Sequence, residues 1–380
     1  MIEKKRLFIR KEYCFFISRS DKIGKMTKKR GYKNMMKRIL SMMLATVLML
    51  SMTACGGSGE EAGTTAEKSD FKVGLVTDVG GVEDQSFNQS AWEGLKRAEE
   101  ELGISVAYLT STTDADYAPN IETFVDEEYD LIVCVGYMLA EATREAAENY
   151  PDQQFAIVDD TSNADLENVS CLMFRAEQAS YLVGYVAGMM TEKDTVGLVL
   201  GMASDTMHLF GYGYTAGVLD ANPNAKILQA NANSFGDPAL GSTLATNFIT
   251  NDADVIFHAA AATGTGVITE CDAKGAMAIG VDSDQNYLAP ETVITSAMKR
   301  VDNAVYSVCE KLVNGTLDGG VTMYDITNEG VDIAPTTTLL PEEVITAVED
   351  VKGKIVSGEI EVPTTKEAFE AIYGDVYTLD

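Results

Sequence analysis

The chain has 380 residues, enough for two domains of ordinary size, and a formal net charge of -29. The charge is unevenly placed: residues 1–54 hold 14 of the 29 basic residues and 3 of the 58 acidic ones, which leaves 15 basic and 55 acidic residues for the rest. Such an acidic body argues against a nucleic-acid-binding protein and against adsorption to an anionic membrane, because both depend on basic patches.

A targeting segment precedes the body of the chain. Lys37-Arg38 is followed by the apolar run 39–50 and then by small residues up to Cys55. A basic stretch, a short apolar run and a small-residue cleavage site are typical of a secretory signal. An uncleaved transmembrane helix is the weaker alternative, since the run is short for spanning a bilayer. Met36 suits a translation start, so we interpret residues 1–35 as an upstream extension that need not be translated.

The segment 56–69 is rich in Gly, Ser, Thr and Glu, which indicates a flexible tether with nothing to bury in a core. The cysteines beyond it are widely spaced, which fits neither a metal motif nor a small disulfide framework. We therefore expect no metal site, and buried free thiols at Cys134 and Cys171, which lie in strand-like runs.

Strands and helices then alternate along the chain. Continuous apolar strands that alternate with helices predict parallel sheets covered on both faces. The pattern stops and begins again near residue 195, which predicts two similar, doubly wound α/β lobes. The expected strands cover 71–77, 104–110, 130–135, 154–158, 169–174, 195–200, 226–230, 254–257, 276–281 and 293–296. The expected helices cover 88–102, 120–128, 138–149, 176–191, 209–220, 238–250, a segment that ends at 273, 301–314 and 341–357.

The last segments are expected to cross back between the lobes, which makes both lobes discontinuous. The predicted organisation is an extension and signal over 1–54, a tether over 55–70, a first lobe over 71–175 and about 286–325, and a second lobe over 176–285 and about 326–380.

The turn 78–90 joins the first strand to the first helix and carries several groups that suit a ligand. It holds the carboxylates of Asp78 and Asp84, the hydroxyl of Ser86, the ring of Phe87 and the amide of Asn88. An aromatic face beside carboxylate and amide groups suits a planar ring with hydrogen-bonding edges. A purely structural interpretation stays open, in which Asp84 or Ser86 caps the helix and Phe87 packs as a hydrophobic staple.

Other candidates also follow strands. Asp159, Asp282 and Lys299 each come at the end of an expected strand, and Gly264 follows another strand by a loop. Ligands of open α/β sheets bind at the carboxyl ends of strands, so these residues and Asp78 predict a site where the two lobes face each other. Each aspartate alone would more often be structural, because Asp commonly ends strands and caps helices.

Motifs of enzymes are sparse. The two histidines, His208 and His258, are too few for a histidine-based metal centre or a conventional triad. Gly264-Thr265-Gly266 lacks the rest of a dinucleotide fingerprint, and the sequence has no Walker A pattern. We therefore expect a binding protein without a cofactor.

Several segments together resemble the basic membrane protein family, the PnrA-like substrate-binding lipoproteins of ABC transporters. The resemblance extends from Phe71 to about Val362 and is carried by KVGLVTDVGGVEDQSFNQS (72–90), AWEGL (91–95), QFAIVD (154–159), ASYLVGYVAG (179–188), GVDSDQ (280–285) and TSAMKRVD (295–302). One departure is Ala261-Ala262-Thr263-Gly264, where the family has Gly-Gly-Thr-Gly. A second is Gly201–Phe210, which lacks an expected proline.

The resemblance implies a type I periplasmic-binding-protein fold and a nucleoside ligand, with purines as the expected class. It implies that Phe87 stacks on the base and that Asn88 and Asp159 contact the base edge. Asp78, Ser86, Asp282 and Lys299 would hold the ribose, beside the loop of Gly264. A second aromatic residue from the other lobe would close the stack, with Phe257 and His258 as equal candidates.

The resemblance also implies that Cys55 follows a lipobox, with Met52 where leucine is usual, and becomes the lipidated N-terminus. The protein would then be anchored at the extracytoplasmic face of the cell membrane and serve a permease and ATPase subunits. Alternatives are a receptor for another small polar ligand such as a sugar, a nucleoside-processing enzyme with Asp78 or Asp159 as base, and a signalling or adhesion role that uses the same pocket.

Overall fold

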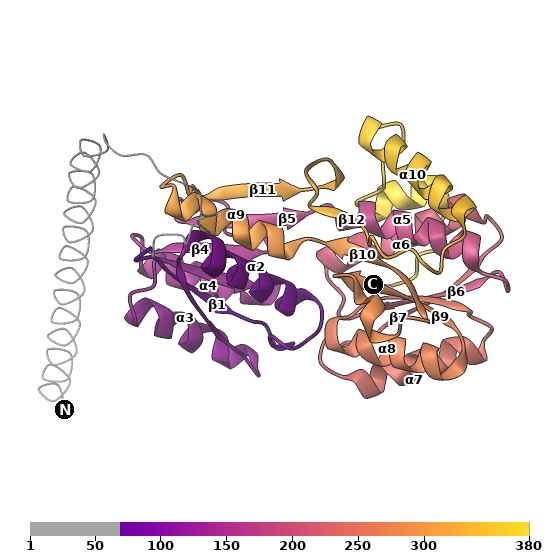
Figure 1. Ribbon diagram of the computed structural model, residues 1–380, viewed down its shortest axis with the longest axis horizontal. Coiled ribbons are helices and arrows are strands. Elements are labelled where there is room, and N and C mark those ends of the chain that lie inside the picture. The colour runs from indigo at the N-terminus through magenta and orange to yellow at the C-terminus, as the bar shows by residue number, and fades with distance from the viewer. Residues whose placement is uncertain (1–68, 380) are drawn as a thin grey trace, which may run out of the picture. The chain divides into compact units, whose positions relative to one another are not determined.

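The computed structural model, which describes residues 69–379, consists of two α/β lobes, each built on a six-stranded sheet (Figure 1). The predicted extension, signal segment and Cys55 lie outside these residues, as does most of the predicted tether. Within residues 69–379, no helix is long and apolar enough to cross a bilayer.

The first sheet is parallel throughout and has the strand order β11-β5-β4-β3-β1-β2. Helices α2 (Phe87–Leu102) and α9 (Val301–Val313) cover one face, and α3 (Tyr117–Asp126) and α4 (Ala140–Asn149) cover the other. Because both faces are covered, the central strands are apolar throughout rather than alternating. The strands are β1 (Lys72–Val76), β2 (Ser105–Leu109), β3 (Leu131–Val135), β4 (Gln154–Val158), β5 (Val169–Phe174) and β11 (Gly320–Tyr324).

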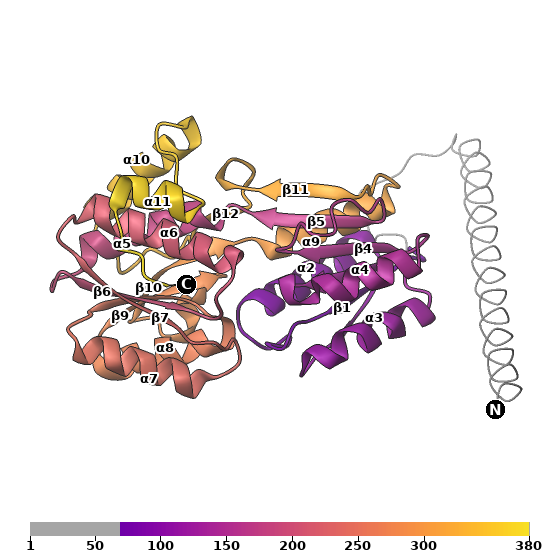
Figure 2. The same ribbon diagram turned by 180° about the vertical axis from the view of Figure 1, so that it is seen from behind.

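The second sheet has the order β12-β10-β9-β8-β6-β7, in which β12 runs antiparallel to β10. Seen from behind in Figure 2, α5 (Ala176–Met190), α6 (Asp205–Ala221) and α10 (Glu342–Ser357) lie on one side, and α7 (Pro238–Thr250) and α8 (Ala261–Lys274) on the other. The strands are β6 (Thr195–Leu200), β7 (Lys226–Asn231), β8 (Val255–Ala259), β9 (Met277–Asp282), β10 (Val293–Lys299) and β12 (Val331–Ile333).

Helices α5 and α6 of the second lobe are closely packed against each other. A Cβ atom on Gly184 would lie 2.2 Å from the carbonyl oxygen of Tyr214, and one on Gly217 would lie 2.1 Å from that of Tyr181. These glycines let the two backbones touch, which accounts for the glycine spacing in the segment 179–188.

The chain passes between the lobes near residues 175, 300 and 325, where β5 leads into α5, β10 leads into α9, and β11 is followed by β12. Residues 293–299 pair with β9 and β12 and therefore lie in the second lobe, whereas the sequence analysis placed 286–325 in the first. The pairing of β10 with β9 and β12 is a tertiary feature that a local sequence pattern does not show. Strand β10 and helix α9 lie on opposite sides of the crossing.

Within the described residues, buried apolar side chains of both lobes form the core. Its buried members extend from Val73 to Tyr377. The C-terminal helix α11 (Lys366–Tyr373) contributes Phe369, which stacks on Tyr212 of α6. Both lobes belong to one compact unit.

Candidate ligand-binding site

The turn before α2 is organised by the carboxylate of Asp84. Oδ1 accepts hydrogen bonds from the backbone N–H groups of Ser86 (2.9 Å) and Gln89 (3.0 Å), and Oδ2 accepts one from that of Asn88 (2.9 Å). Asp84 thus satisfies the free N–H groups at the start of the helix. The hydroxyl of Ser86 is thereby released from capping and donates to Oδ2 of Asp282 in the second lobe.

The carboxamide of Asn88 is engaged by protein groups on both ends. Its Nδ2 donates to Oδ1 of Asp78 (2.8 Å) and to Oδ2 of Asp84 (3.0 Å), and its Oδ1 accepts from the backbone N–H of Asp78 (3.3 Å). Because an amide nitrogen has two hydrogens, both donors are used. Asn88 therefore orients Asp78 and keeps no N–H for another partner.

The second oxygen of Asp78 lies beside the glycine that ends β3. A Cβ atom on Gly136 would be 3.3 Å from Oδ2 of Asp78 and 3.4 Å from the ring of Phe87. Gly136 has a φ of 108°, which favours glycine. Absence of a side chain here keeps the carboxylate and the ring close to one another.

Lys299 joins groups from both lobes. Its ammonium forms an ion pair with Asp159 of the first lobe and is 4.6 Å from the ring centre of Phe87, 5.1 Å from that of Phe174 and 5.8 Å from that of Phe210. Lys299 is 2% exposed, so the carboxylate and the ring faces provide the stabilisation that water would otherwise give.

Burial raises the pKa of two carboxylates in this cluster. Burial raises the pKa of Asp78 to about 6, although hydrogen bonds from Gly80 and Asn88 partly offset this effect by lowering the pKa. Burial likewise raises the pKa of Asp282 to about 6, although the positive charge of Lys299 lowers it in part. Strongly perturbed carboxylates at the carboxyl edge of a sheet are typical of functional sites.

Seven predicted site residues therefore form one connected cluster at the facing edges of the two sheets. They are Asp78, Ser86, Phe87, Asn88, Asp159, Asp282 and Lys299. Among the described residues, no group of three or more His, Cys, Asp or Glu is arranged to hold a metal ion.

The structure places the other three predicted residues in the interior of the second lobe. Phe257 is fully buried, with its ring centre 5.0 Å from that of Tyr214 of α6. His258 points to the other side of the sheet, where a Cβ atom on Gly264 would be 1.9 Å from its Nδ1. Burial lowers the pKa of His258 to about 4, so the imidazole is neutral. Gly264 thus makes room for His258, and these residues pack against their own lobe.

Sequence reasoning missed Phe174 and Phe210, the additional rings around Lys299. Phe174 is the last residue of β5, so the strand-end criterion used for the aspartates would have found it. Phe210 lies in the second turn of α6, which begins at Asp205 and not at the predicted Leu209.

Comparison with known proteins identifies the family. Residues 71–366 match the family described as ABC transporter substrate-binding protein PnrA-like (Bmp). The chain belongs to this family. It is therefore the substrate-binding component of a transporter and not an enzyme.

Relatives and solved structures agree with this assignment. A CD4+ T-cell-stimulating antigen of Listeria innocua is 39% identical, over 85% of this chain and 97% of its own length. The ABC transporter nucleoside-binding protein BmpA of Lactococcus lactis is 33% identical, over 87% of this chain and 100% of its own length. A crystal structure of an ABC transporter solute-binding protein from Aeropyrum pernix superposes with a TM-score of 0.72 at 29% identity, over 80% of this chain and 97% of that one. The predicted two-lobed solute-binding fold is confirmed.

Proposed function

We propose that this protein captures a nucleoside between its two lobes and delivers it to the permease of an ABC transporter, which ATPase subunits drive. The observation that carries the proposal is the cluster around Lys299. Its ammonium lies over the ring of Phe87 and pairs with Asp159, and its charge acts on the carboxylate of Asp282. A nucleoside has the matching chemistry, namely a planar ring for an aromatic face and vicinal hydroxyls for carboxylates. The similarity to the nucleoside-binding protein BmpA of Lactococcus lactis supports the same ligand class.

In this proposal Phe87 stacks on the base, and Phe210 of the second lobe is the candidate for the opposite face in place of Phe257 or His258. Asp159 accepts a hydrogen bond from the base edge. Asn88, whose donors are occupied, acts through Asp78 and does not donate to the base itself.

The sugar is assigned to the remaining polar groups. Asp78 and Asp282 accept hydrogen bonds from the ribose hydroxyls. Ser86 donates to Asp282, and the positive charge of Lys299 acts on the same carboxylate. Purine nucleosides remain the expected class.

Calorimetric titration of the body 66–380, unfolded and refolded to remove bound ligand, tests the proposal. Guanosine, adenosine, inosine, uridine, cytidine and ribose are titrated separately. We expect tight binding of at least one purine nucleoside and no heat from ribose. Silence from every nucleoside in a correctly refolded sample would contradict the proposal, and binding of ribose alone would favour a sugar receptor.

We also propose that Cys55 carries lipid and anchors the body at the extracytoplasmic face through the segment 56–69. The basic stretch, apolar run and cysteine in the sequence support this. A Cys55→Ser substitution should move the protein from the membrane fraction to the soluble fraction, because it removes the thiol to which the lipid is attached. Cys134→Ser, at a buried thiol, is the matched control. Unchanged membrane retention of Cys55→Ser would indicate an uncleaved helix instead.

A further inference from the structure

The side chain of Gln285 is fixed at the carboxyl end of β9 by its own lobe. Its Oε1 accepts a hydrogen bond from the backbone N–H of Val281 (2.9 Å), and its backbone N–H donates to Oγ of Ser296 (3.1 Å). A Cβ atom on Gly280 would lie 2.6 Å from Oε1, so glycine at that position makes room for the carboxamide. With its oxygen held by Val281, the amide has its NH₂ group left to donate, and the buried imidazole of His258 in the second lobe also lies within reach of this side chain.

That NH₂ group reaches the first lobe. Nε2 of Gln285 donates to the backbone carbonyl of Gln85 at 2.9 Å. Gln85 lies between Asp84, which caps α2, and Ser86, which contacts Asp282. The hydrogen bond therefore connects the end of β9 directly to the turn that carries the proposed ligand groups.

The backbone at this contact is held in an uncommon conformation. Gln85 has a φ of 57°, and the site residues Asp159 and Asp282 have φ values of 65° and 64°. Non-glycine residues persist in the left-handed region where the surrounding structure holds them there, often at ligand clamps. At Gln85 the left-handed turn directs the carbonyl toward the opposite lobe.

The short helix that begins at Gln285 also lies close to the start of α2. The short helix η3 (Gln285–Leu288) begins with the residue that donates to Gln85 of the first lobe, and it carries Tyr287, which is 57% exposed and whose pKa is raised by partial burial and by the negative charges of Glu93 and Asp84. The helix η3 is thus an element of the second lobe that faces the start of α2.

We propose that Gln285 is a positioning residue that latches the two lobes together, and that it controls how long the ligand is held without contacting it. This role rests on the proposed function as a receptor. A neutral hydrogen bond between the lobes stabilises the closed form, so its loss favours opening and speeds ligand release. The association rate depends on the open form and should change little.

The test compares two variants with a matched control. Gln285→Glu keeps the oxygen that Val281 requires and loses the NH₂ donor, and Gln285→Met removes the donor without adding charge. Asn286→Asp is the control, because Nδ2 of Asn286 donates to the carbonyl groups of Pro290 and Val293 within the second lobe. All three proteins are first checked for cooperative unfolding.

The first measurement is the distance between spin labels at Glu145→Cys on α4 and Asn247→Cys on α7, both exposed, in the body 66–380. The native cysteines of the described residues are buried, so the labels react selectively. We expect both Gln285 variants to populate longer distances than the parent protein, with and without inosine, while Asn286→Asp matches the parent. Opening with Gln285→Glu alone would indicate a charge effect and overturn the latch.

The second measurement is stopped-flow binding of inosine. Loss of one neutral hydrogen bond predicts dissociation faster by roughly three- to tenfold, with association changed by less than about twofold. Unchanged dissociation, or equal acceleration by Asn286→Asp, would also overturn the latch. If no variant and no parent protein binds any nucleoside, the proposed function fails, while the label distances still decide whether Gln285 holds the lobes together.

Discussion

At the scale of single residues, Lys299 shows how the site balances charge. The ammonium is buried, pairs with Asp159 and lies over the rings of Phe87 and Phe174. A buried cation requires such partners, because removal from water costs several kcal/mol. The same ring faces are suited to a planar ligand.

Phe87 is the residue with the sharpest expected effect on binding. Phe87→Ala should weaken binding of the preferred nucleoside by roughly 1–3 kcal/mol, the range of other aromatic–base stacks. Phe87→Tyr keeps the ring and serves as the control, with calorimetry as the measurement. Equal affinities of Phe87→Ala and the parent protein would remove Phe87 from the site.

Ala261 begins α8 with a φ of 46°, at a position where the family pattern has glycine. A non-glycine residue in this region costs about 1 kcal/mol, so Ala261→Gly should stabilise the protein by up to about that amount. Ala262→Gly, inside the helix, should instead cost roughly 0.5–1 kcal/mol. Urea unfolding measures both changes, and a loss of stability in both variants would contradict the assigned strain.

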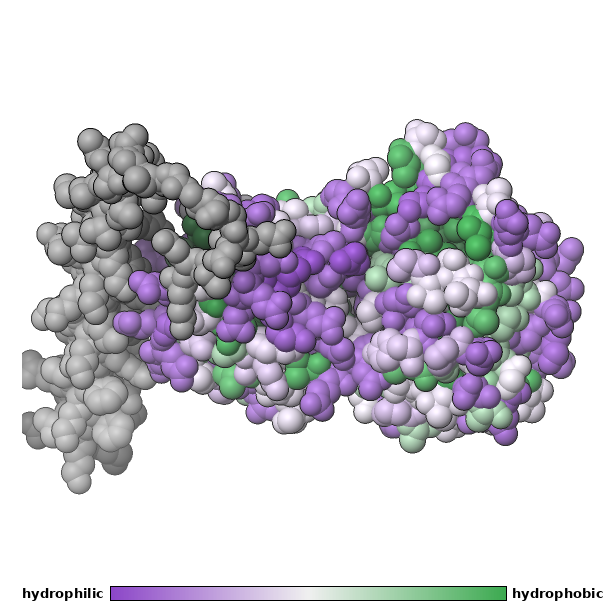
Figure 3. All heavy atoms as spheres, viewed as in Figure 1, coloured by the Kyte–Doolittle hydropathy of each residue, from purple (hydrophilic) through white to green (hydrophobic). Residues whose placement is uncertain are grey.

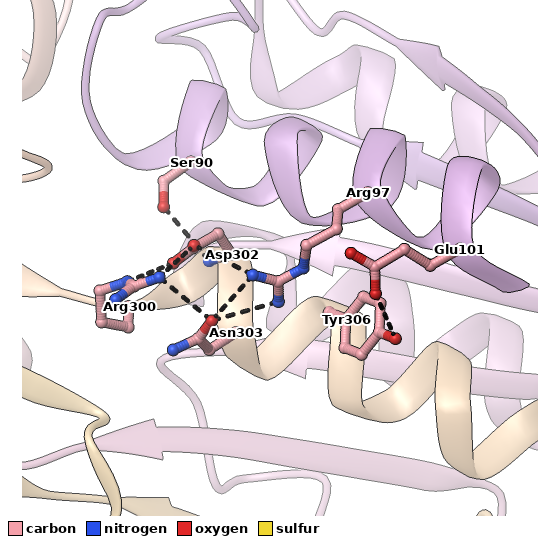
Figure 4. A network of polar contacts seen from close by, with 7 residues as sticks. All are labelled: Ser90, Arg97, Glu101, Arg300, Asp302, Asn303 and Tyr306. Atoms are coloured by element: carbon pink, nitrogen blue, oxygen red, sulfur yellow. Dashed lines mark hydrogen bonds and ion pairs between the residues drawn. The ribbon is translucent and has the colours of Figure 1, made fainter. Parts of the chain in front are cut away.

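At the scale of secondary-structure elements, helix α9, which follows the crossing from the second lobe, is attached to α2 within the first lobe. Figure 4 shows Arg97 of α2 directed at Asn303 and Asp302 near the start of α9, while Ser90 accepts from the backbone N–H of Asp302. Arg97 also lies 4.3 Å over the ring of Tyr306. Hydrophilic residues predominate over this face in Figure 3. These contacts attach the helix that follows the lobe crossing to the helix whose start carries the site.

The start of α2 depends on both oxygens of Asp84. Asp84→Asn replaces one acceptor by an NH₂ group that would face two donors, so it should destabilise the protein by roughly 2 kcal/mol. Asp237→Asn is the matched control, because Asp237 caps α7 through Oδ1, which accepts a hydrogen bond from the backbone N–H of Leu240. Asparagine caps a helix about as well as aspartate in that case. Urea unfolding should separate the two variants, and similar losses would contradict the assignment.

Prediction from sequence succeeded best for elements with strong local signals. The strands 169–174 and 195–200 and the helix 238–250 have their predicted bounds, because apolar runs and the Asp237-Pro238 helix start are local features. The sequence analysis missed β11, β12 and α11. Strands β11 and β12 lie at the edges of their sheets, and their residues are stabilised mainly by the neighbouring strand.

At the scale of the whole molecule, stability should depend on pH through the buried carboxylates. The pKa of Asp78 in the folded state is about 6, above its ordinary value of 3.8, so the folded state binds the proton first on acidification. Asp78 should therefore contribute about 1 kcal/mol more stability near pH 5 than near pH 7. Asp282 acts in the same direction. His258, with a lowered pKa of about 4, acts in the opposite direction below its ordinary value of 6.5.

Comparison with Asp78→Asn isolates one of these contributions. The free energy of unfolding of the parent protein should rise relative to that of the variant as the pH falls from about 7 to about 5. Denaturant titrations at several pH values measure the difference. Parallel profiles for the two proteins would show that Asp78 titrates at its ordinary pKa.

The sequence by itself determined the two α/β lobes and the strand-end positions of Asp78, Asp159, Asp282 and Lys299, because strand periodicity and strand ends are local properties of the chain. The family followed from the resemblance of several segments and is confirmed by the match over residues 71–366. Only the tertiary structure decided which of the candidate groups are free to contact a ligand. It engaged both donors of Asn88, buried Phe257 and His258 in their own lobe, and brought Phe210 to Lys299. The physical reason is that hydrogen-bond partners and ring contacts come from segments far apart in the sequence, whose mutual orientation is set by packing of the two sheets and their helices.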